Sequence, residues 1–431
     1  MMTVLEESLQ ESPFEGLSKE LNLKSDEERL WWEKTGVMLA RVLSSASYTR
    51  DEQLQYLQFY AQALLPLLGP YPQSFRSSIT RSGLPLELSI NYQQQEKPLV
   101  VRIGFEPLNA LSGTPKDPFN CLPAFELLSS LAQLRIPGYD EQIWHQVIQD
   151  HTVSQAERGA LQGVDLEAGY IRSQTAFGFD LTREGKIAVK GYSFPALKCK
   201  VTGQSMAQLM ATSIANLTPL IDCSPAFATV DAYLREVGYD DRSFFSWDFV
   251  DPARSRLKLY TGSNSVTWEK LAEVWTLGNR VQSPTVARGL EYLRQLWDQL
   301  QLAAGERDIV VAFDDQQSTS KATPLLWNYE MRAGNPTPLT KLYFPVHGES
   351  DWKVITAVAD FLCHIGLERH GQGYVEKVKS YYPGVDLTTT DRFTSWVSFA
   401  YTEKTGVYLS TYYHSSTDNP WKITVEEEEQ A

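Results

Sequence analysis

The most constraining feature of the sequence is a hairpin pattern that occurs five times. Each occurrence has two runs in which apolar and polar residues alternate, joined by turn-forming residues such as Gly, Pro, Asn or Asp. Alternation with a period of two is typical of a β-strand whose two faces meet different surroundings. The five predicted hairpins cover residues 84–107, 171–195, 243–262, 323–346 and 392–414, and the fourth is expected to turn at Gly334, Asn335 and Pro336.

Helical periodicity occupies the intervals between the predicted hairpins. The first predicted helix begins with a capping box, in which Ser25 and Glu28 satisfy each other's backbone N–H groups. Helix, helix, strand and strand therefore recur as a unit along the chain. The predicted helices cover residues 25–43, 51–69, 267–278, 283–302 and 350–366.

Ten antiparallel strands with helices between the hairpins can close into a barrel that the helices surround. We therefore expect an α+β fold built as a closed ten-stranded barrel of five ααββ repeats. One barrel domain is expected over residues 25–422, after an N-terminal extension at 1–24 and before an acidic tail at 423–431. In such a barrel the outward strand faces pack on helices and must be apolar.

The inward strand faces carry cations and tyrosines. In the run "RSRLKLYTG", Leu257 and Leu259 alternate with Arg256, Lys258 and Tyr260. A sheet whose charges face solvent is the alternative, but five strands with the same basic and tyrosine-rich face favour a central chamber. The same parity gives the whole inward set: Glu87, Ser89, Asn91, Arg102, Lys190, Tyr192, Arg256, Lys258, Tyr260, Lys341, Tyr343, Tyr408 and Tyr412.

Composition limits what such a chamber can bind. The net charge of −14 argues against a nucleic-acid-binding surface, and it makes a cluster of cations more informative. Aromatic residues make up 12% of the chain, which suits a cavity with an aromatic lining. We therefore expect small-molecule partners and neither nucleic acid nor membrane.

Cysteine spacing and the N-terminal residues bear on the compartment. Cys121, Cys199, Cys223 and Cys363 are far apart and form no Cys-x-x-Cys, so neither a disulfide framework nor a zinc site is expected. The segment "MMTVLEESLQESPFEG" lacks the features of a signal peptide, and no run of 18 apolar residues occurs. A reducing, cytoplasmic location is the expectation.

The inward cations and tyrosines suit one kind of chemistry. Confined Arg and Lys side chains bind a compact polyanion such as a diphosphate. Aromatic faces stabilise a cation by about 0.5–2 kcal/mol each. Together they suit the ionisation of an allylic diphosphate. The two Asp-Asp pairs, at 240 and 314, do not complete the Asp-Asp-x-x-Asp pattern that binds Mg²⁺, so metal-independent chemistry is expected.

Glu87 is the single carboxylate predicted on the inward face of the first hairpin. It has two interpretations. It either pairs with Arg102 on the neighbouring strand or accepts the N–H hydrogen bond of a heteroaromatic acceptor, which would enrich the ring for electrophilic attack and help to remove a proton.

Eleven short segments spread along the chain resemble those of a known family. The chain resembles the fungal indole prenyltransferases of the dimethylallyltryptophan synthase family over essentially its whole length. The resemblance implies the five-repeat barrel known as the ABBA or PT fold, and transfer of dimethylallyl from its diphosphate to an indole ring without an essential metal. The segments that carry it are "DEERLWW", "LLGPYP", "SGLPLELSINY", "VRIGFEP", "DPFN", "VKGYSFP", "SRLKLY", "EVWTLG", "LYFPVHG", "WVSFAYT" and "GVYLSTYYHS".

The resemblance also implies roles for individual residues. Glu87 is similar to the catalytic glutamate that binds the indole. The implied diphosphate-binding residues are Arg102, Lys190, Arg256, Lys258 and Lys341. The implied shield around the cation and diphosphate is Tyr192, Tyr260, Tyr343, Tyr408 and Tyr412. The expected acceptor pocket is Leu84, Gly104, Arg172, Trp327 and Trp396.

The segments "RSGLPLELSINY" and "RIGFEP" look closest to enzymes that reverse-prenylate brevianamide F and related tryptophan-containing cyclic dipeptides. The expected reaction is therefore reverse prenylation of a cyclic dipeptide at C2 or C3 of the indole, in indole alkaloid biosynthesis. Gly104 shares the face of Arg102 and leaves room for an acceptor larger than tryptophan, although a backbone requirement for glycine explains it equally well. Free L-tryptophan or another indole is the alternative acceptor, and a non-catalytic ligand-binding barrel is a remote one.

Two positions depart from the family pattern. Many members carry Lys where this chain has Arg172, and arginine stays protonated and serves poorly as a base. The group that removes the final proton is therefore left open. Some members carry Gln where this chain has Lys341, so the diphosphate site is expected to be more strongly cationic here.

Overall fold

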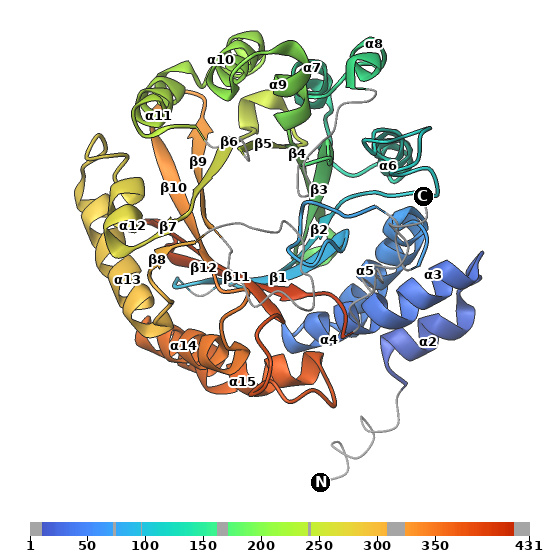
Figure 1. The fold of residues 1–431 in the computed structure, drawn as a ribbon. Helices are drawn as coiled ribbons and strands as arrows, with labels where there is room; N and C mark the ends of the chain where they lie inside the picture. Colours follow the sequence, from blue (N-terminus) through green and yellow to red (C-terminus); the bar gives the residue numbers. More distant parts are fainter. Residues whose placement is uncertain are drawn as a thin grey trace, which may run out of the picture.

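The computed structural model describes residues 11–71, 75–95, 97–161, 171–239, 243–307 and 324–417. Ten antiparallel strands form one closed barrel, with helices around its outside (Figure 1). This confirms the predicted α+β class and the predicted barrel. The strands are β1 (Leu86–Gln93), β2 (Val100–Phe105), β3 (Thr175–Leu181), β4 (Ile187–Ser193), β5 (Phe244–Asp248), β6 (Leu257–Ser263), β9 (Leu325–Arg332), β10 (Asn335–Pro345), β11 (Thr394–Thr402) and β12 (Gly406–His414).

The two strands of each predicted hairpin pair with each other, and each hairpin also pairs with the hairpins on either side of it. The order around the barrel is β1, β12, β11, β10, β9, β6, β5, β4, β3 and β2, and β2 pairs with β1 to close it. One turn differs from the prediction. Asn335 already pairs with Arg332, so the fourth hairpin turns at Ala333 and Gly334, and the register then shifts between Asn335 and Leu339. The positive φ of Gly334, 72°, explains why glycine suits this tight turn.

Helices fill every interval between the hairpins, including several that the sequence pattern did not predict. The helices before β1 are α2 (Pro13–Glu20), α3 (Asp26–Trp31), α4 (Val37–Ser45) and α5 (Arg50–Phe59), with π-helical turns at Trp32–Gly36 and Tyr60–Leu64 and a 3₁₀ turn at Leu65–Leu67. Between β2 and β3 lie α6 (Leu122–Gln133), α7 (Gln142–His151) and α8 (Gln155–Arg158). The later ones are α9 (Ala196–Thr202), α10 (Met206–Leu217), α11 (Ser224–Val237), α12 (Trp268–Trp275), α13 (Pro284–Leu300), α14 (Asp351–His364) and α15 (Glu368–Tyr381).

The predicted capping box at Ser25 is only half formed. The Ser25 hydroxyl accepts the N–H of Glu28 at 3.1 Å, but the Glu28 carboxylate accepts the N–H of Lys24 at 2.7 Å rather than that of Ser25. Glu28 therefore still satisfies a free N–H group before the helix, one residue earlier than a capping box does.

The hydrophobic core lies between the barrel wall and the surrounding helices. Val101, Ile103 and Phe105 are buried on the outward face of β2, as the parity of the sequence predicts. On the outer face of β4, the Trp247 side chain of neighbouring β5 comes so close that a Cβ on Gly191 would lie 2.3 Å from its ring. This packing turns the apolar faces outward and leaves the polar faces to the inside of the barrel.

The ends of the predicted domain are partly described. Within the segment predicted as an extension, α2 packs against α4 and α5, and Leu17 is buried in the main core. The predicted acidic tail at 423–431 and both Asp-Asp pairs lie outside the described residues, so the boundaries at 24 and 422 stay predictions. Among the described helices, none has the length and apolar character needed to span a bilayer.

Candidate active site

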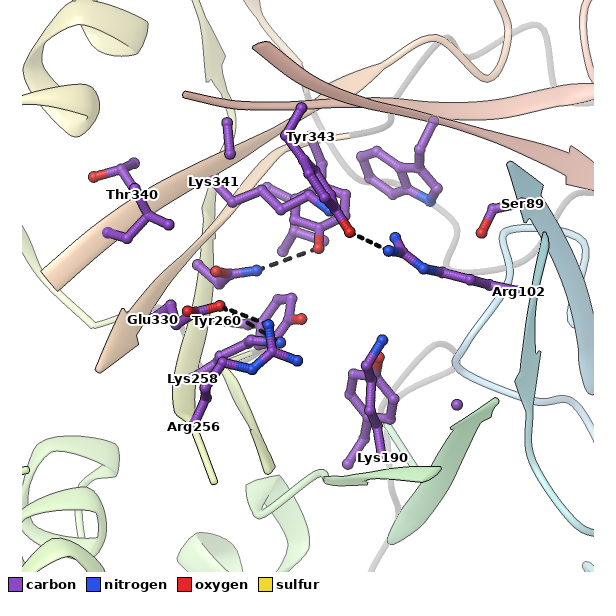
Figure 2. A pocket seen from close by; sticks show the side chains of 18 of the residues that line it. Ser89, Arg102, Lys190, Arg256, Lys258, Tyr260, Glu330, Thr340, Lys341 and Tyr343 are labelled. Carbon is purple, nitrogen blue, oxygen red and sulfur yellow. Dashed lines mark hydrogen bonds and ion pairs between the residues drawn. The ribbon is translucent and has the colours of Figure 1, made fainter. Parts of the chain in front are cut away.

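The inside of the barrel is a cavity of about 940 Å³ that all ten strands line. Figure 2 shows Arg102, Lys190 and Lys341 projecting from β2, β4 and β10 toward one open space. Because successive residues of a strand point to opposite faces, this one face of each strand brings together groups that are far apart in sequence. The lining includes Glu87, Ser89, Arg102, Gly104, Lys190, Tyr192, Arg256, Lys258, Tyr260, Lys341, Tyr343, Trp396, Tyr408 and Tyr412.

The chamber has a charged end and an aromatic end. On each of β4, β6 and β10, a lysine lies nearer the hairpin turn and a tyrosine lies two residues further along the strand. On β2, Arg102 and Gly104 have the same relation. The hairpin turns all lie at one end of the barrel, so the cations and Tyr408 gather near that end. Four other lining tyrosines gather near the opposite end: Tyr192, Tyr260, Tyr343 and Tyr412.

Carboxylates accompany the cations, and the sequence reasoning missed them. Asp180 on β3 binds both Arg102, at 3.0 Å, and Lys190, at 2.5 Å. Asp248 on β5 binds Arg256 through two bonds of 2.6 and 2.8 Å. Because these carboxylates lie between cations that would otherwise repel one another, they make the burial of the cations tolerable.

Glu330 on β9 is the third carboxylate of the charged end. It lies 3.2 Å from Arg256 and 3.9 Å from Lys258. Three carboxylates face the five predicted diphosphate-binding cations, so full ionisation leaves a formal excess of two positive charges. Lys341 has no ion pair with a carboxylate within the described part of the chain, and its ammonium lies 5.2 Å from the ring centre of Tyr343 and 5.1 Å from that of Tyr408.

Burial and neighbouring charges set the ionisation of these groups. Burial alone would raise the pKa of Asp180, but Arg102 and Lys190 outweigh it and hold the pKa well below its usual range. Burial lowers the pKa of Lys190 to about 8, although Asp180 opposes the change. Burial, together with Arg102 and Lys258, also lowers the pKa of Lys341 well below its usual value. The chamber therefore disfavours further positive charge, and a bound anion would offset the repulsion among its cations.

The aromatic end is a continuous belt of tyrosines. The ring centres of Tyr192 and Tyr260 are 6.2 Å apart, those of Tyr260 and Tyr343 are 6.0 Å apart, and those of Tyr343 and Tyr412 are 5.9 Å apart. Phe244, which the sequence reasoning missed, stacks on Tyr260 at 4.2 Å. Such a belt gives a cation several aromatic faces and keeps water away from it.

Glu87 faces this belt and is not paired with Arg102. It lies opposite Gly104 in the register, whereas Arg102 binds Asp180 and the hydroxyl of Tyr408. Oε1 of Glu87 is buried without a hydrogen-bond partner. Burial raises the pKa of Glu87 to about 8, although a hydrogen bond with Ser395 opposes the rise. An unpaired carboxyl oxygen beside an aromatic cavity is suited to a ligand N–H.

Some predicted acceptor-pocket residues do not line the chamber. Trp327 pairs with Leu342, lies in the core between barrel and helices, and so faces outward. The expectation that Trp327 contacts the acceptor is therefore corrected, because strand parity puts its neighbours Leu326 and Asn328 inside. Two other predicted pocket residues are also absent from the lining: Leu84 lies in the core, and Arg172 is exposed. Asn91, which is predicted to face inward, is absent from the lining as well, and it bonds to Leu409 and Ser410 on β12.

The register of the strands places each of the three missed carboxylates opposite a cation. Arg102 pairs with Asp180, Lys190 with Asp248, and Lys258 with Glu330 across neighbouring strands. The sequence reasoning followed mainly the second strand of each hairpin. The same parity applied to the first strands places Asp180, Asp248 and Glu330 inward.

A family profile, curated relatives and solved structures all show similarity between this chain and prenyltransferases. The profile of the family described as "Tryptophan dimethylallyltransferase" matches residues 27–377. Prenyltransferase okaC of Penicillium ochrochloron is 74% identical over 100% of both chains. Reverse prenyltransferase criA of Aspergillus cristatus is 42% identical, covering 97% of this chain and 99% of that one. The crystal structure of NotF in complex with brevianamide F and DMSPP matches with a TM-score of 0.86 and 37% identity, over 95% of this chain and 100% of that one.

The depressed pKa of Lys190 predicts how anion binding depends on pH. Below about pH 8 Lys190 is a cation that attracts a diphosphate, and above it the charge is lost. The affinity for inorganic diphosphate should therefore fall by up to roughly tenfold for each pH unit above 8. Lys190→Arg keeps its charge and should show a flatter dependence. Isothermal titration calorimetry from pH 7 to 9 measures both, and equal slopes would contradict the role of Lys190. Ionisation of the ligand affects both proteins alike.

Proposed function

We propose a function on one premise: the chain belongs to the tryptophan dimethylallyltransferase family. The protein is an indole prenyltransferase. It transfers a dimethylallyl group from dimethylallyl diphosphate to the indole ring of a tryptophan-containing cyclic dipeptide. The observation that carries the proposal is the division of one chamber into a cationic end and an aromatic end, with the unpaired oxygen of Glu87 at the aromatic end.

The cationic end is the proposed site of the diphosphate. Arg102, Lys190, Arg256, Lys258 and Lys341 supply donors and positive charge where the C–O bond of the substrate breaks. The bonding electron pair leaves with the diphosphate, and the cations stabilise the negative charge that develops there. Asp180, Asp248 and Glu330 hold four of these cations in place before the substrate binds.

The tyrosine belt is the proposed site of the allyl cation. Tyr192, Tyr260, Tyr343 and Tyr412 present a series of neighbouring rings, and Tyr408 hydrogen-bonds Arg102 at the charged end. Burial raises the pKa of Tyr192 and Tyr343 well above the usual value, so their phenols stay neutral and do not trap the cation as phenolates. The belt shields the cation until the indole attacks it.

Glu87 is the proposed partner of the indole. Its free oxygen accepts the indole N–H, which increases the electron density of the ring where the new C–C bond forms. After attack at C2, loss of the C2 proton restores the aromatic ring. C3 carries the tryptophan side chain and no proton, so attack there leaves an N1=C2 iminium, which is neutralised by loss of the N1 proton. Arg172 is exposed and outside the lining, so it is not the proposed proton acceptor.

The acceptor is proposed to be a cyclic dipeptide rather than free tryptophan. Gly104 and Gly178 face each other on β2 and β3, and both line the chamber beside Glu87. Gly104 adds no side chain to this wall, which leaves room for the diketopiperazine ring beside Glu87, whereas the Tyr192 ring already covers Gly178. The solved NotF complex, 37% identical, contains brevianamide F, and this likeness supports the same class of acceptor here. Reverse attack at C2 or C3 is the proposed outcome.

The reaction is proposed to need no metal. The positive charge that Mg²⁺ brings in other prenyl-transfer sites is supplied here by side chains. In the charged end, the carboxylates Asp180, Asp248 and Glu330 are all engaged by Arg or Lys. No group of three metal-ligating side chains occurs in the part of the chain that the structure describes.

Small molecules are the proposed partners, and the cytoplasm is the proposed location. All four cysteines are free, and two of them are buried. Free thiols suit a reducing compartment, where a biosynthetic enzyme of this kind meets dimethylallyl diphosphate.

The function is tested by one assay. The purified protein is incubated with dimethylallyl diphosphate and cyclo-Trp-Pro, cyclo-Trp-Ala or free L-tryptophan, each with and without EDTA, and the products are analysed by mass spectrometry. We expect a gain of one isoprene unit on a cyclic dipeptide, unchanged by EDTA because side chains neutralise the diphosphate. Loss of product in EDTA would contradict metal independence. Product from tryptophan alone would favour the alternative acceptor, and none from any substrate would favour a binding barrel.

Glu87→Gln separates catalysis from binding. The amide cannot act as a carboxylate toward the indole N–H, so kcat/KM for the acceptor should fall by roughly 10²–10⁴-fold. Diphosphate affinity should not change, because Glu87 does not contact the cations that bind it. In a barrel that only stores a ligand, the substitution would be silent.

The pH dependence of stability provides the control for folding. The pKa of Glu87 rises from 4.5 to about 8 on folding, so the unfolded chain loses this proton at a lower pH than the folded chain does. Stability is therefore lost progressively from about pH 4.5 to about pH 8, and the loss stays constant above pH 8. Glu87→Gln removes this cost. The difference in Tm between the variant and the wild type should therefore change in favour of the variant as the pH rises from 5 to 9. A variant whose Tm is lower than that of the wild type at every pH would show that the loss of activity is structural.

A further inference from the structure

Glu106 is a buried carboxylate that the chemistry above does not use. It directly follows the last residue of β2, and its side chain is completely buried. Its N–H donates to the carbonyl of Pro85 at 2.9 Å, which continues the pairing of β2 with β1 by one residue. By alternation Glu106 therefore lies on the side of Arg102 and Gly104, beyond Gly104 at the aromatic end of the chamber.

Three donors from three separate segments meet at this carboxylate. Oε2 accepts the hydroxyl protons of Ser77, at 2.5 Å, and Ser173, at 2.8 Å. Oε1 accepts the side-chain amide of Asn120 at 3.0 Å. Burial raises the pKa of Glu106 to about 7, and these three donors oppose the rise. The Glu106 carboxylate is thus the shared hydrogen-bond acceptor of three chain segments, which contain Ser77, Asn120 and Ser173.

The bonds continue from Glu106 to the wall of the chamber. The Ser173 hydroxyl oxygen accepts the backbone N–H of Ser78 at 3.0 Å, and the Ser77 hydroxyl oxygen accepts that of Ile79 at 3.3 Å. Ser78 and Ile79 both line the chamber, as does Glu87. Each of these two wall residues is therefore held by a serine that Glu106 itself holds.

We propose that Glu106 is a positioning residue that fixes Ser78 and Ile79 as the wall against which the acceptor rests. The proposal rests on the proposed function, because it concerns where the cyclic dipeptide lies relative to Glu87. A firm wall at this end determines which indole carbon faces the allyl cation. Glu106 has no contact with the diphosphate-binding cations among its hydrogen bonds, so it acts on the acceptor and not on the prenyl donor.

The test compares Glu106→Ala with Glu106→Gln in the assay with cyclo-Trp-Pro. Removal of the carboxyl group frees the Ser78–Ile79 wall, and a misplacement of about 1 Å lowers kcat/KM for the acceptor by roughly 10–100-fold. The KM for the acceptor should rise, the KM for dimethylallyl diphosphate should stay within about twofold, and NMR should show a mixture of prenylated regioisomers. Glu106→Gln keeps an acceptor oxygen and should restore most of the regioselectivity.

Glu349→Ala is the matched control. Glu349 is also a buried carboxylate, and it binds Arg307 at 3.2 Å and the N–H of Ala303 at 3.2 Å, but it is not among the residues that line the chamber. Its loss should lower Tm without changing the product ratio. If Glu106→Ala fails to fold, Ser173→Ala removes one of the two relays and should shift the acceptor KM and the product ratio in the same direction.

The outcomes separate this inference from the proposed function. Wild-type protein that makes no product contradicts the proposed function. Wild-type turnover together with an unchanged acceptor KM and a single regioisomer in Glu106→Ala, or in Ser173→Ala when the first variant does not fold, contradicts the positioning role. Equal effects of Glu349→Ala and Glu106→Ala on the product ratio would also contradict it, since they would mark a general loss of stability.

Discussion

Five cations enclosed in one chamber repel one another, and the structure depends on the carboxylates that separate them. Asp180 bridges Arg102 and Lys190, while Asp248 and Glu330 hold Arg256. Without these ion pairs, desolvation and repulsion would make the charged end of the barrel costly to bury. With them, the side chains are held in place and keep a formal excess of positive charge. That excess supports the proposed diphosphate site, and burial together with the neighbouring cations lowers the pKa values of Lys190 and Lys341.

The barrel fixes where the charged and aromatic groups lie relative to each other. Four of the five hairpins contribute the five cations near the turn, and on three strands a tyrosine lies two residues beyond the lysine, which gives the charged and aromatic ends a fixed spacing. The helices bury the outward faces and make the wall rigid. At the aromatic end, Glu87 presents a free oxygen, and behind the wall Glu106 anchors the segments that complete it. The proposed function uses this arrangement to hold the leaving group, the cation and the nucleophile in order along the barrel, as alkylation of an indole requires.

Much of the fold and part of the site could be predicted from the sequence because strand parity is a local property. The alternation of Leu257 and Leu259 with Lys258 and Tyr260 is visible in the printed residues, and the closed barrel follows from its recurrence. Parity alone also contradicts the predicted place of Trp327 in the acceptor pocket. The ion pairs needed the register between strands, which the sequence reasoning did not work out. The bonds of Glu106 join residues 29 and 67 positions apart through irregular segments, and no periodic pattern indicates such contacts. Several helices were missed because only the strongly amphipathic intervals were identified.

The central claim is that the two ends of the chamber hold the two substrates in a fixed order. The most direct measurement is a crystal structure of the protein with the unreactive dimethylallyl thiolodiphosphate and cyclo-Trp-Pro. The account predicts the diphosphate among Lys190, Arg256 and Lys258, the allyl group against the tyrosine belt, and the indole N–H on Oε1 of Glu87. A diphosphate bound away from these cations, or an indole N–H directed away from Glu87, would contradict it.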